Sequence, residues 1–434
     1  MSAADETPQA YLALPADRVR RRRIAVVGGG VMGTATAYAA ARLGGAGVTV
    51  DLYEAQQIGH EGAASIDSAR LFRHAYGELS YYTRWAAEAF VLWLDLERQS
   101  GQTLYVQTGS VWAAHAEQHV AIPPAMARVF LSEDPRAFME GSRKAMTALG
   151  LPNEILDRAE YRKRFRQFAD TGVVAAFLDV NSGLLLARDA VLALGDLSRR
   201  FGVTVHEGKR ALEVAPTDAG CGVRFADGTS IEADVVVLAI NGWLADVLPD
   251  LPRRLAVAGA VDGSIEWDTG LLITEQVMHY LVPDPAVAAE FEPGRMPFCT
   301  WASNGIWAFP ARNRAVKIGD NYPVRTLRHP TERRMPEPAF RERVLDLARE
   351  QMPGLRDATL VQERTCFYDY SPDGDFILDQ WDEHARLMVA CGFSGHGFKF
   401  GPLVGQRLAQ FALTGQRPAD LAPFALARLA ATAR

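Results

Sequence analysis

A glycine-spaced stretch near the C-terminal end of the chain could hold a flat or charged ligand against its backbone. Glycines let main-chain amides approach a ligand closely, and a lysine between two aromatic side chains can add positive charge at short range. The stretch has both features, because residues 391–400 read Cys-Gly-Phe-Ser-Gly-His-Gly-Phe-Lys-Phe. We expect Gly395, His396, Gly397 and Lys399 to contact the ligand.

A second glycine loop, near the other end of the chain, indicates what that ligand is. Gly28, Gly30 and Gly33 form a GxGxxG pattern that follows the apolar run 24–27 and precedes the small-residue stretch 34–43. A strand, a tight turn and a helix in this order place backbone amides and the positive end of the helix dipole beside a pyrophosphate. The loop therefore predicts dinucleotide binding. The alternative is a glycine-rich turn without a ligand.

An acidic residue at the expected distance supports the dinucleotide interpretation. Residues 48–53 are typical of the next strand, and Glu54 follows them directly. A carboxylate at this position can accept hydrogen bonds from both ribose hydroxyls of a bound nucleotide.

The elements that must position these loops alternate along the chain. Between the loops, the segment from about 255 to 355 mixes alternating strands, prolines and aromatic residues, and it interrupts elements of the nucleotide-binding type. This pattern predicts an α/β protein with two discontinuous domains. We expect helices at 81–97, at 189–201 and from about 401, and strands at 104–114, 203–206, 211–214, 222–225, 233–240 and 386–390.

Composition narrows the class of protein. The chain has 434 residues, 48% of them hydrophobic and 23% charged, and a net charge of -6, which argues against nucleic acid as a partner. The longest apolar runs, such as 235–240, are too short to cross a bilayer, and the polar start, 1–10, does not resemble a secretory signal. We expect no membrane partner and a disordered tail over 1–19.

Cysteine and histidine usage indicates a reducing compartment and no metal. Cys221, Cys299, Cys366 and Cys391 are scattered without CxxC pairs, which suggests neither a zinc site nor a disulfide scaffold. The cytoplasm is the natural location for such a chain. The histidines show no spacing typical of metal ligands, so no metal site is predicted.

Three segments carry a resemblance to a known family. Residues 70–78 read Arg-Leu-Phe-Arg-His-Ala-Tyr-Gly-Glu, residues 363–377 read Glu-Arg-Thr-Cys-Phe-Tyr-Asp-Tyr-Ser-Pro-Asp-Gly-Asp-Phe-Ile, and residues 392–400 belong to the stretch described first. Together with the GxGxxG loop, they resemble the D-amino-acid-oxidase-like FAD-dependent oxidoreductases, in particular the branch of monomeric sarcosine oxidase and N-methyltryptophan oxidase. The likeness runs from about Arg23 to the C-terminus.

The resemblance implies a fold and domain bounds. It predicts a Rossmann-like FAD-binding domain, discontinuous over 20–104, 182–254 and 358–434, and a substrate domain with an antiparallel sheet over 105–181 and 255–357. It also implies a monomer.

The resemblance further implies roles for single residues. Cys366 matches a cysteine that bonds covalently to the flavin, and the alternative is a buried free cysteine. Lys317 matches the lysine over the flavin face where oxygen is reduced. Arg73 and Lys399 match the pair that grips a substrate carboxylate, so the expected catalytic residues are Lys317, Arg73 and Lys399. Arg70 is expected near the flavin ring, and Ala211 is expected beside the cofactor.

The implied reaction is oxidation of an amino acid C–N bond to an imine, with hydride transfer to FAD and with oxygen reduced to hydrogen peroxide. Asp320 and Asn321 stand where sarcosine-type relatives carry a histidine that faces substrate. We therefore expect an N-methyl, cyclic or aromatic amino acid or imino acid as substrate, with Asn321 and Trp307 among its contacts. The aromatic segment 298–307 either faces substrate or packs the second domain. An imine oxidase, an L-amino-acid oxidase or dehydrogenase in a secondary-metabolite pathway, a flavin monooxygenase and a noncatalytic flavin-binding protein remain alternatives.

Overall fold

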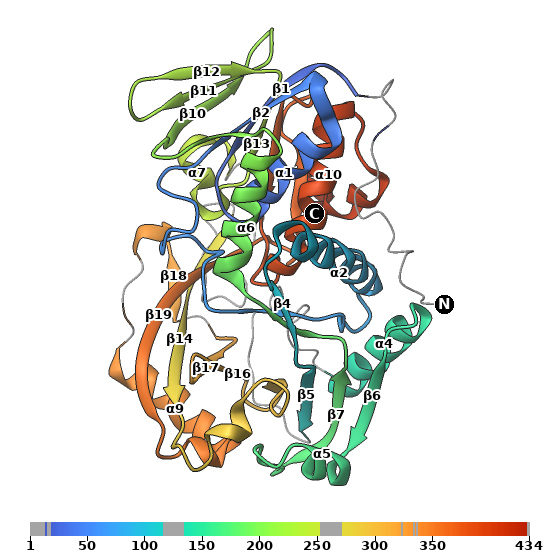
Figure 1. The fold of residues 1–434 in the computed structure, drawn as a ribbon, viewed down its shortest axis with the longest axis vertical. Coiled ribbons are helices and arrows are strands. Elements are labelled where there is room, and N and C mark those ends of the chain that lie inside the picture. Colours follow the sequence, from blue (N-terminus) through green and yellow to red (C-terminus); the bar gives the residue numbers. More distant parts are fainter. Residues whose placement is uncertain are drawn as a thin grey trace.

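The computed structural model describes residues 14, 19–115, 134–251, 271–322, 324–332, 335 and 337–431. The predicted disordered tail, 1–19, lies outside the described residues apart from positions 14 and 19. Within the described ranges, the strands form one six-stranded sheet, one nine-stranded sheet and two sheets of three strands. We call the first two the parallel sheet and the large sheet. Figure 1 shows the parallel sheet in the upper half of the molecule and the large sheet below it.

The parallel sheet is assembled from distant parts of the chain. Its strand order is β20-β21-β13-β1-β2-β9, and only the edge pair of β20 and β21 is antiparallel. Buried parallel strands need apolar residues on both faces, which explains the uninterrupted Val-Val-Val-Leu run of β13. The strands are β1 (Arg22–Val27), β2 (Val48–Tyr53), β9 (Thr204–His206), β13 (Val235–Leu238), β20 (Ile377–Gln380) and β21 (Leu387–Cys391).

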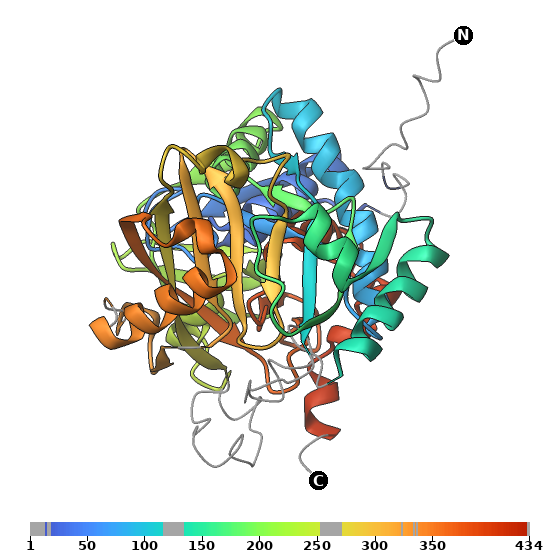
Figure 2. The same cartoon turned by 90° about the horizontal axis from the view of Figure 1, so that it is seen from below.

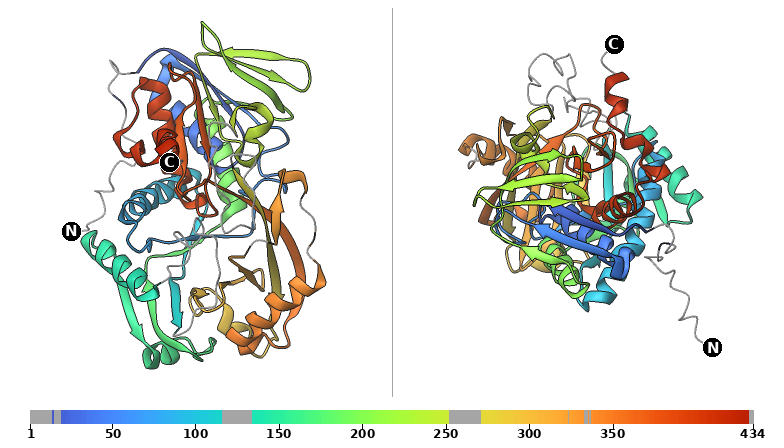
Figure 3. Two further views of the ribbon diagram at one scale, coloured as in Figure 1. Left: turned by 180° about the vertical axis from the view of Figure 1, so that it is seen from behind. Right: turned by 90° about the horizontal axis from the view of Figure 1, so that it is seen from above.

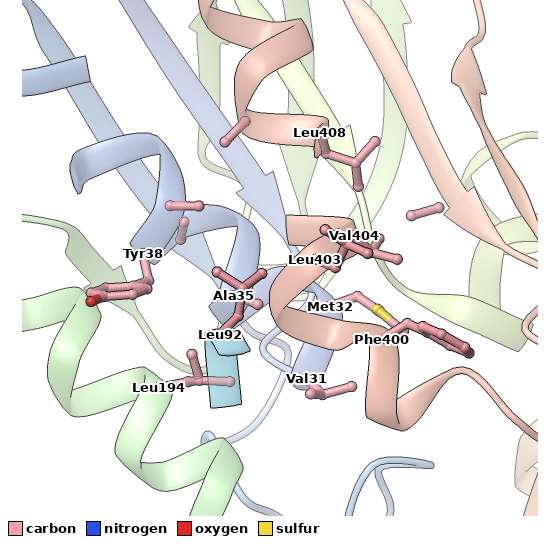
Figure 4. Packing of buried hydrophobic residues seen from close by; sticks show 14 of the residues in the cluster. Val31, Met32, Ala35, Tyr38, Leu92, Leu194, Phe400, Leu403, Val404 and Leu408 are labelled. Atoms are coloured by element: carbon pink, nitrogen blue, oxygen red, sulfur yellow. The ribbon is translucent and has the colours of Figure 1, made fainter. Parts of the chain in front are cut away.

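Helices pack tightly around the first of these, α1 (Val31–Gly44). Figure 4 shows α1 between α10 (Gly401–Thr414) and α6 (Ala187–Arg200), with Met32 beside Leu403 of α10 and Ala35 on the side toward Leu194 of α6. Small residues allow this close packing, because a Cβ on Gly405 of α10 would lie 2.5 Å from the backbone of Ala35. The helix α2 (Ser80–Ser100) packs beside them. The glycine loop before α1 is thus held by a rigid core.

The large sheet forms the lower half of the molecule. Its order is β18-β14-β17-β16-β15-β5-β7-β6, and β19 pairs with β14. All pairs are antiparallel except β15 with β5. The strands are β5 (Ser110–His115), β6 (Asn153–Asp157), β7 (Val173–Asp179), β14 (Leu272–Val282), β15 (Phe298–Trp301), β16 (Ile306–Arg312), β17 (Ala315–Asp320), β18 (Arg325–Leu327) and β19 (Thr359–Tyr370).

One face of the large sheet is covered by helices. Seen from below, α9 (Pro338–Gln351) and α5 (Arg158–Arg164) lie across the strands, with α4 (Pro135–Ala148) at one side (Figure 2). Val344 and Ala348 of α9 pack with Val316 and Ile318 of β17 in one buried cluster. Side chains alternate along a strand, so the neighbours Lys317 and Gly319 face the other way, toward the parallel sheet.

Two small sheets complete the fold. Strands β10 (Ala211–Pro216), β11 (Cys221–Phe225) and β12 (Ser230–Ala233) form an antiparallel sheet that crosses the top of the molecule (Figure 3). The other small sheet contains β3 (Arg70–Phe72), β8 (Gly183–Leu185) and β4 (Tyr105–Gln107).

The predicted α/β class with a Rossmann-like parallel sheet is confirmed. The second sheet, which was expected to be antiparallel, contains one parallel pair, β15 with β5. Two element predictions need correction. The single strand expected over 104–114 is two strands in different sheets, β4 and β5, because Gly109 turns the chain with a φ of 73°. The strand expected over 233–240 is shorter and starts after β12. A short helix, α7 (Leu244–Val247), follows β13. The domain bounds stay a prediction.

Candidate functional site

One cavity is lined by most of the residues singled out above. Its volume is about 550 Å³, and it lies where the carboxyl ends of β1 and β13 meet the face of the large sheet that carries Lys317. Ligands of open α/β sheets bind at this edge of the strands. The predicted site residues that line it are Gly28, Gly30, Glu54, Arg70, Arg73, Ala211, Trp307, Lys317, Asn321, Gly395, His396, Gly397 and Lys399. Gly33 and Cys366 are not among the lining residues.

The glycine loop forms one end of the cavity and has no room for side chains. Gly28 has a φ of 109°, and a Cβ there would lie 2.5 Å from the carbonyl oxygen of Ala239. Gly33 sits one turn into α1, where a Cβ would lie 1.7 Å from the carbonyl oxygen of Gly28. Gly33 therefore acts behind the cavity wall, by letting α1 begin directly against the turn.

Glu54 closes this end of the cavity at the end of β2. Its Oε2 accepts a hydrogen bond from the backbone N–H of Gly29 at 2.6 Å, and its Oε1 accepts one from Gln56 at 2.9 Å. The ring of His60, which also lines the cavity, lies 3.6 Å from Oε1. The carboxylate is thus fixed beside the loop, with lone pairs left for ribose hydroxyls. Backbone glycines and a fixed carboxylate in one cavity fit the FAD that the family resemblance implies.

The register of the large sheet brings its functional side chains onto one face. Thr300 pairs with both Trp112 and Trp307, and Phe309 pairs with Lys317. Paired residues of neighbouring strands point to the same side of a sheet, and all five side chains line the cavity. Trp307 lies across the strand beside Lys317 because the neighbouring Gly319 has no Cβ, which would come within 2.4 Å of the indole.

The aromatic segment of residues 298–307 has both roles that the sequence left open, because it faces the cavity and also packs on the opposite side of the large sheet. Phe298 and Trp307 line the cavity, whereas Trp301 points to the opposite face. Trp301 is completely buried there, and its indole N–H donates to the hydroxyl of Tyr161 at 3.3 Å.

Lys317 is buried in the cavity wall and paired with a carboxylate. Its Nζ donates to Oδ2 of Asp67 at 2.7 Å and to the carbonyl oxygen of Ala69 at 2.9 Å. The same Oδ2 of Asp67 binds the guanidinium of Arg70. Burial lowers the pKa of Lys317 to about 8, against the opposing charge of Asp67. Lys317 is therefore an ammonium at neutral pH, and the charge of Asp67 opposes the loss of its proton.

Cys366 lies on the same side of the large sheet, in β19. Its Sγ is 3.6 Å from the guanidinium Nη2 of Arg70 and 3.8 Å from the carbonyl oxygen of Ala64. Arg70 and Ala64 both line the cavity, so the thiol sits directly behind its wall. All four cysteines of the chain are buried and free.

Arg73 and Lys399 bring two further buried cations to the cavity. The guanidinium of Arg73 lies 3.8 Å from the ring centroid of Tyr76 and 5.0 Å from that of Trp112. The Nζ of Lys399 donates to the hydroxyl of Tyr76 at 2.9 Å and to the carbonyl oxygen of His396 at 2.8 Å. Burial, and then the charge of Arg73, hold the pKa of Lys399 well below its ordinary value. Within the described ranges, no carboxylate forms an ion pair with Lys399.

His396 is a neutral ring in this cluster. Its Nδ1 lies 3.2 Å from the hydroxyl of Tyr76. Burial, followed by the charges of Lys399 and Arg73, lowers the pKa of His396 far below its ordinary value. A neutral imidazole beside glycine amides suits a binding role better than proton abstraction.

Several residues of the site were missed from the sequence. Asp67 and Trp112 had no local motif to mark them, and Tyr76 stood in the Arg-His-Ala-Tyr segment without an assigned role. Lys209 and Arg210 also line the cavity next to Ala211. Their signal was the placement of two cations directly before a strand of the nucleotide-binding region.

The described part of the chain shows neither a cluster of metal-ligating side chains nor a membrane-spanning helix. No group of three or more histidine, cysteine, aspartate or glutamate side chains there could hold a metal ion. None of the helices found there has the length and apolar character needed to span a bilayer.

Comparisons with known proteins agree with this geometry. A family model described as FAD dependent oxidoreductase matches residues 23–411. N-methyl-L-tryptophan oxidase of Yersinia pestis (strain Pestoides F) is 28% identical over 410 residues, which cover 93% of this chain and 98% of that protein. The family resemblance seen in the sequence is thereby confirmed.

Solved structures agree on the fold. L-proline dehydrogenase from P. horikoshii superposes with a TM-score of 0.76 at 18% identity, over 95% of this chain and 99% of that chain. NikD, an unusual amino acid oxidase essential for nikkomycin biosynthesis, superposes with a TM-score of 0.73 at 23% identity, over 94% and 97%. Because the family model spans most of its length, the chain belongs to the FAD dependent oxidoreductase family.

Proposed function

We propose that this enzyme oxidises the C–N bond of a small amino acid to an imine, with molecular oxygen as electron acceptor and hydrogen peroxide as product. The observation that carries the proposal is one cavity lined by two cation sites, Arg73 with Lys399 and Lys317 with Arg70. In the balanced reaction, amine and oxygen give imine and hydrogen peroxide, and water then hydrolyses the imine unless it is cyclic and stable.

The cofactor end of the cavity is assigned to FAD. Gly28, Gly30, Glu54, Ala211 and the segment 395–397 would hold the cofactor, with Gly33 and Arg70 in supporting positions. When bound, FAD accepts a hydride from the substrate carbon and passes the electrons on to oxygen. The positions of His396 and its neighbouring glycine amides support a role in binding the polar end of the flavin ring.

Arg73 and Lys399 are assigned to the substrate carboxylate. A guanidinium can bind it with two parallel hydrogen bonds, and the ammonium adds a point charge. The indole N–H of Trp112 is buried without a hydrogen-bond partner in the described part of the chain, so it can donate to the same anion. The two positive charges also favour the neutral form of the substrate amine, whose lone pair assists loss of the hydride.

Lys317 is assigned to the reaction with oxygen. A fixed positive charge in a dry site stabilises the negative charge that develops as oxygen is reduced. Lys317 is 3% exposed and lies over the rings of Phe309 and Trp307, at 4.6 and 5.5 Å from their centroids, so little water competes for it.

Cys366 is assigned as the covalent attachment point of FAD. The proximity of its Sγ to the guanidinium of Arg70 supports this role, because a cation favours the thiolate that makes such a bond. The free state of all four cysteines also supports the cytoplasm as location. We further propose that the enzyme acts as a monomer and has the two discontinuous domains delimited above.

Aromatic side chains favour an N-methyl, cyclic or aromatic amino acid or imino acid as substrate. Trp112, Trp307, Phe298 and Phe309 line the cavity on the large-sheet side, and Asn321 adds a polar contact. The relative from Yersinia pestis named above acts on N-methyl-L-tryptophan, which agrees with this preference. An imine oxidase or L-amino-acid oxidase remains the second candidate.

A peroxide assay over a substrate panel tests the proposal. The purified enzyme is offered N-methyl amino acids, cyclic imino acids and ordinary L-amino acids without added nicotinamide, and peroxide is measured with bleaching of the yellow chromophore under anaerobic conditions. Bleaching by one class and stoichiometric peroxide in air are expected. Turnover that requires reduced nicotinamide would instead identify a monooxygenase, and bleaching without peroxide would identify a dehydrogenase.

A further inference from the structure

Asp67 is the one acidic side chain within the described ranges that forms an ion pair with Lys317. It lies in the loop before β3, and its side chain is completely buried. Besides Lys317 and Arg70, the hydroxyl of Tyr280 and the backbone N–H of Ser68 donate to its Oδ1, at 2.5 and 2.6 Å. Every acceptor site of this carboxylate is occupied by the protein itself.

The two cations of this site face the cavity, and the carboxylate of Asp67 lies behind them in the protein interior. Lys317 and Arg70 line the cavity, whereas Asp67 does not. A ligand in the cavity therefore meets two positive groups whose charge is partly balanced from behind the wall. Two cations and one carboxylate leave a single net positive charge at this place.

The carboxylate decides whether Lys317 keeps its proton. Burial and the neighbouring charge of Arg70 both lower the pKa of Lys317, while Asp67 and, to a smaller extent, Cys366 raise it. Arginine stays charged in proteins, so a site without the carboxylate would relieve its repulsion by releasing the lysine proton. Burial alone would raise the pKa of Asp67, but the charges of Lys317 and Arg70 hold it below its ordinary value. The carboxylate is therefore ionised when it acts.

Besides the rings of Phe309 and Trp307, the titratable and charged groups that face Lys317 come from one loop and three strands. Asp67 and Arg70 approach from the loop and from β3, Tyr280 is its partner in β14, and Cys366 lies in β19. Asp67 is the only permanent anion in this set. Asp67 also fixes the orientation of the Lys317 ammonium, because the hydrogen bonds to Asp67 and to the carbonyl oxygen of Ala69 use two of its three protons.

We propose that Asp67 is a positioning residue for the oxygen step: from behind the cavity wall, it keeps Lys317 protonated and aimed into the cavity. The effect on Lys317 is independent of any reaction. The effect on oxygen rests on the function proposed above.

The first test measures the protonation of Lys317 directly. Purified enzyme and its Asp67→Asn variant are labelled with acetic anhydride over a range of pH, and labelling of Lys317 is followed by mass spectrometry. Only the neutral amine reacts, so the midpoint of the pH profile reports the pKa of Lys317. We expect the midpoint to move down by about one pH unit or more, a tenfold or larger change in the proton equilibrium. Asp95→Asn is the matched control, because Asp95 is a buried carboxylate paired with Arg42 at 2.7 Å and does not line the cavity.

The second test separates the two half-reactions. Stopped-flow absorbance should show that anaerobic reduction of Asp67→Asn by substrate stays within about threefold of wild type, whereas its reaction with oxygen at about pH 8 slows about fivefold or more and recovers at lower pH. Asp67→Glu, which keeps the charge, should restore part of the oxygen rate. If Asp67→Asn does not fold, Asp67→Ser, which also removes the charge, takes its place in both tests.

The outcomes distinguish this proposal from the function on which it rests. An unchanged labelling midpoint in Asp67→Asn overturns the proposal, and so does a shifted midpoint with an unchanged oxygen rate. If Lys317→Met reacts with oxygen as fast as wild type, the assigned role of Lys317 fails, which is recognised without any Asp67 variant.

Discussion

The surroundings of Lys399 predict that carboxylate binding takes up a proton. The ammonium of Lys399 is buried, lies near Arg73 and has no carboxylate partner among the described residues, and its pKa is held well below the ordinary value by burial. An anion bound beside it raises that pKa. The complex therefore holds more protons than the free enzyme over the pH range between the two pKa values. Affinity should fall as pH rises through this range, because the free enzyme loses the proton first.

The loss of affinity expected when Lys399 is replaced follows from the contact between its ammonium and the ligand carboxylate. Two unit charges about 4 Å apart attract by about 4 kcal/mol at an effective dielectric constant of about 20. Part of this energy is offset by desolvation, and a hydrogen bond to a charged group contributes about 1.5–3 kcal/mol net. Replacing Lys399 by Met should therefore raise the Kd of a carboxylate ligand about 10- to 100-fold.

A carboxylate ligand that has no amine measures the contribution of Lys399 to carboxylate binding alone. Indole-3-acetate carries a carboxylate that stays ionised above about pH 6, and its indole suits the aromatic wall. Calorimetric titration in two buffers with different heats of ionisation measures proton uptake, and flavin absorbance gives Kd over the same pH range. Lys399→Met should abolish the uptake and flatten the pH profile, whereas Lys163→Met, an equal charge change at an exposed site of α5, should alter neither. Wild-type binding without proton uptake, or full affinity in Lys399→Met, would refute the reasoning.

Three further substitutions have defined outcomes. Lys317→Met should slow the reaction with oxygen about 100-fold while reduction by substrate persists in stopped-flow measurements. The wild-type oxygen rate should fall above about pH 8, because the pKa of Lys317 is about 8. Equal oxygen rates in Lys317→Met and wild type would remove Lys317 from this step. Cys366→Ser should leave an acid-precipitated pellet colourless where the wild-type pellet is yellow, and a colourless wild-type pellet would disprove covalent attachment. Gly33→Ala should lower the free energy of unfolding, measured with denaturant, by about 3 kcal/mol or more, because the new Cβ would lie 1.7 Å from the carbonyl oxygen of Gly28. Gly47→Ala is the control and should be tolerated, because the atom nearest to a Cβ on Gly47 lies at 3.8 Å.

Local spacing was enough to predict the cofactor end of the site. Two glycines of the pattern have a direct steric meaning, because a Cβ on Gly28 would meet the backbone of Ala239 and a Cβ on Gly33 would meet that of Gly28. Glu54 could be predicted because it directly follows β2, whose length and direction place this carboxylate beside the glycine loop. The covalent and catalytic roles came from the family resemblance, and they still await experiment.

Long-range pairs could not be predicted in this way. Asp67 is separated from Lys317 by 250 positions and from Tyr280 by 213, so no sequence spacing relates them. The two tryptophans of the aromatic segment show the same limit. Trp301 and Trp307 face opposite sides only because Thr300 pairs with Trp307 across the turn, and that register depends on the folded sheet.

The two lysines of the cavity differ in their counterions, and in the proposed function this difference separates the pH dependence of the two half-reactions. Lys317 has its counterion in the protein, so it carries its charge before substrate arrives and after product leaves. Lys399 donates to the neutral Tyr76 hydroxyl and to a backbone carbonyl, so it gains a counterion only when an anion binds. In the proposed function, a substrate carboxylate supplies this counterion to Lys399, while Lys317 does not depend on it. The substrate step should consequently respond to pH through Lys399 and the oxygen step through Lys317, with no requirement that the two profiles coincide.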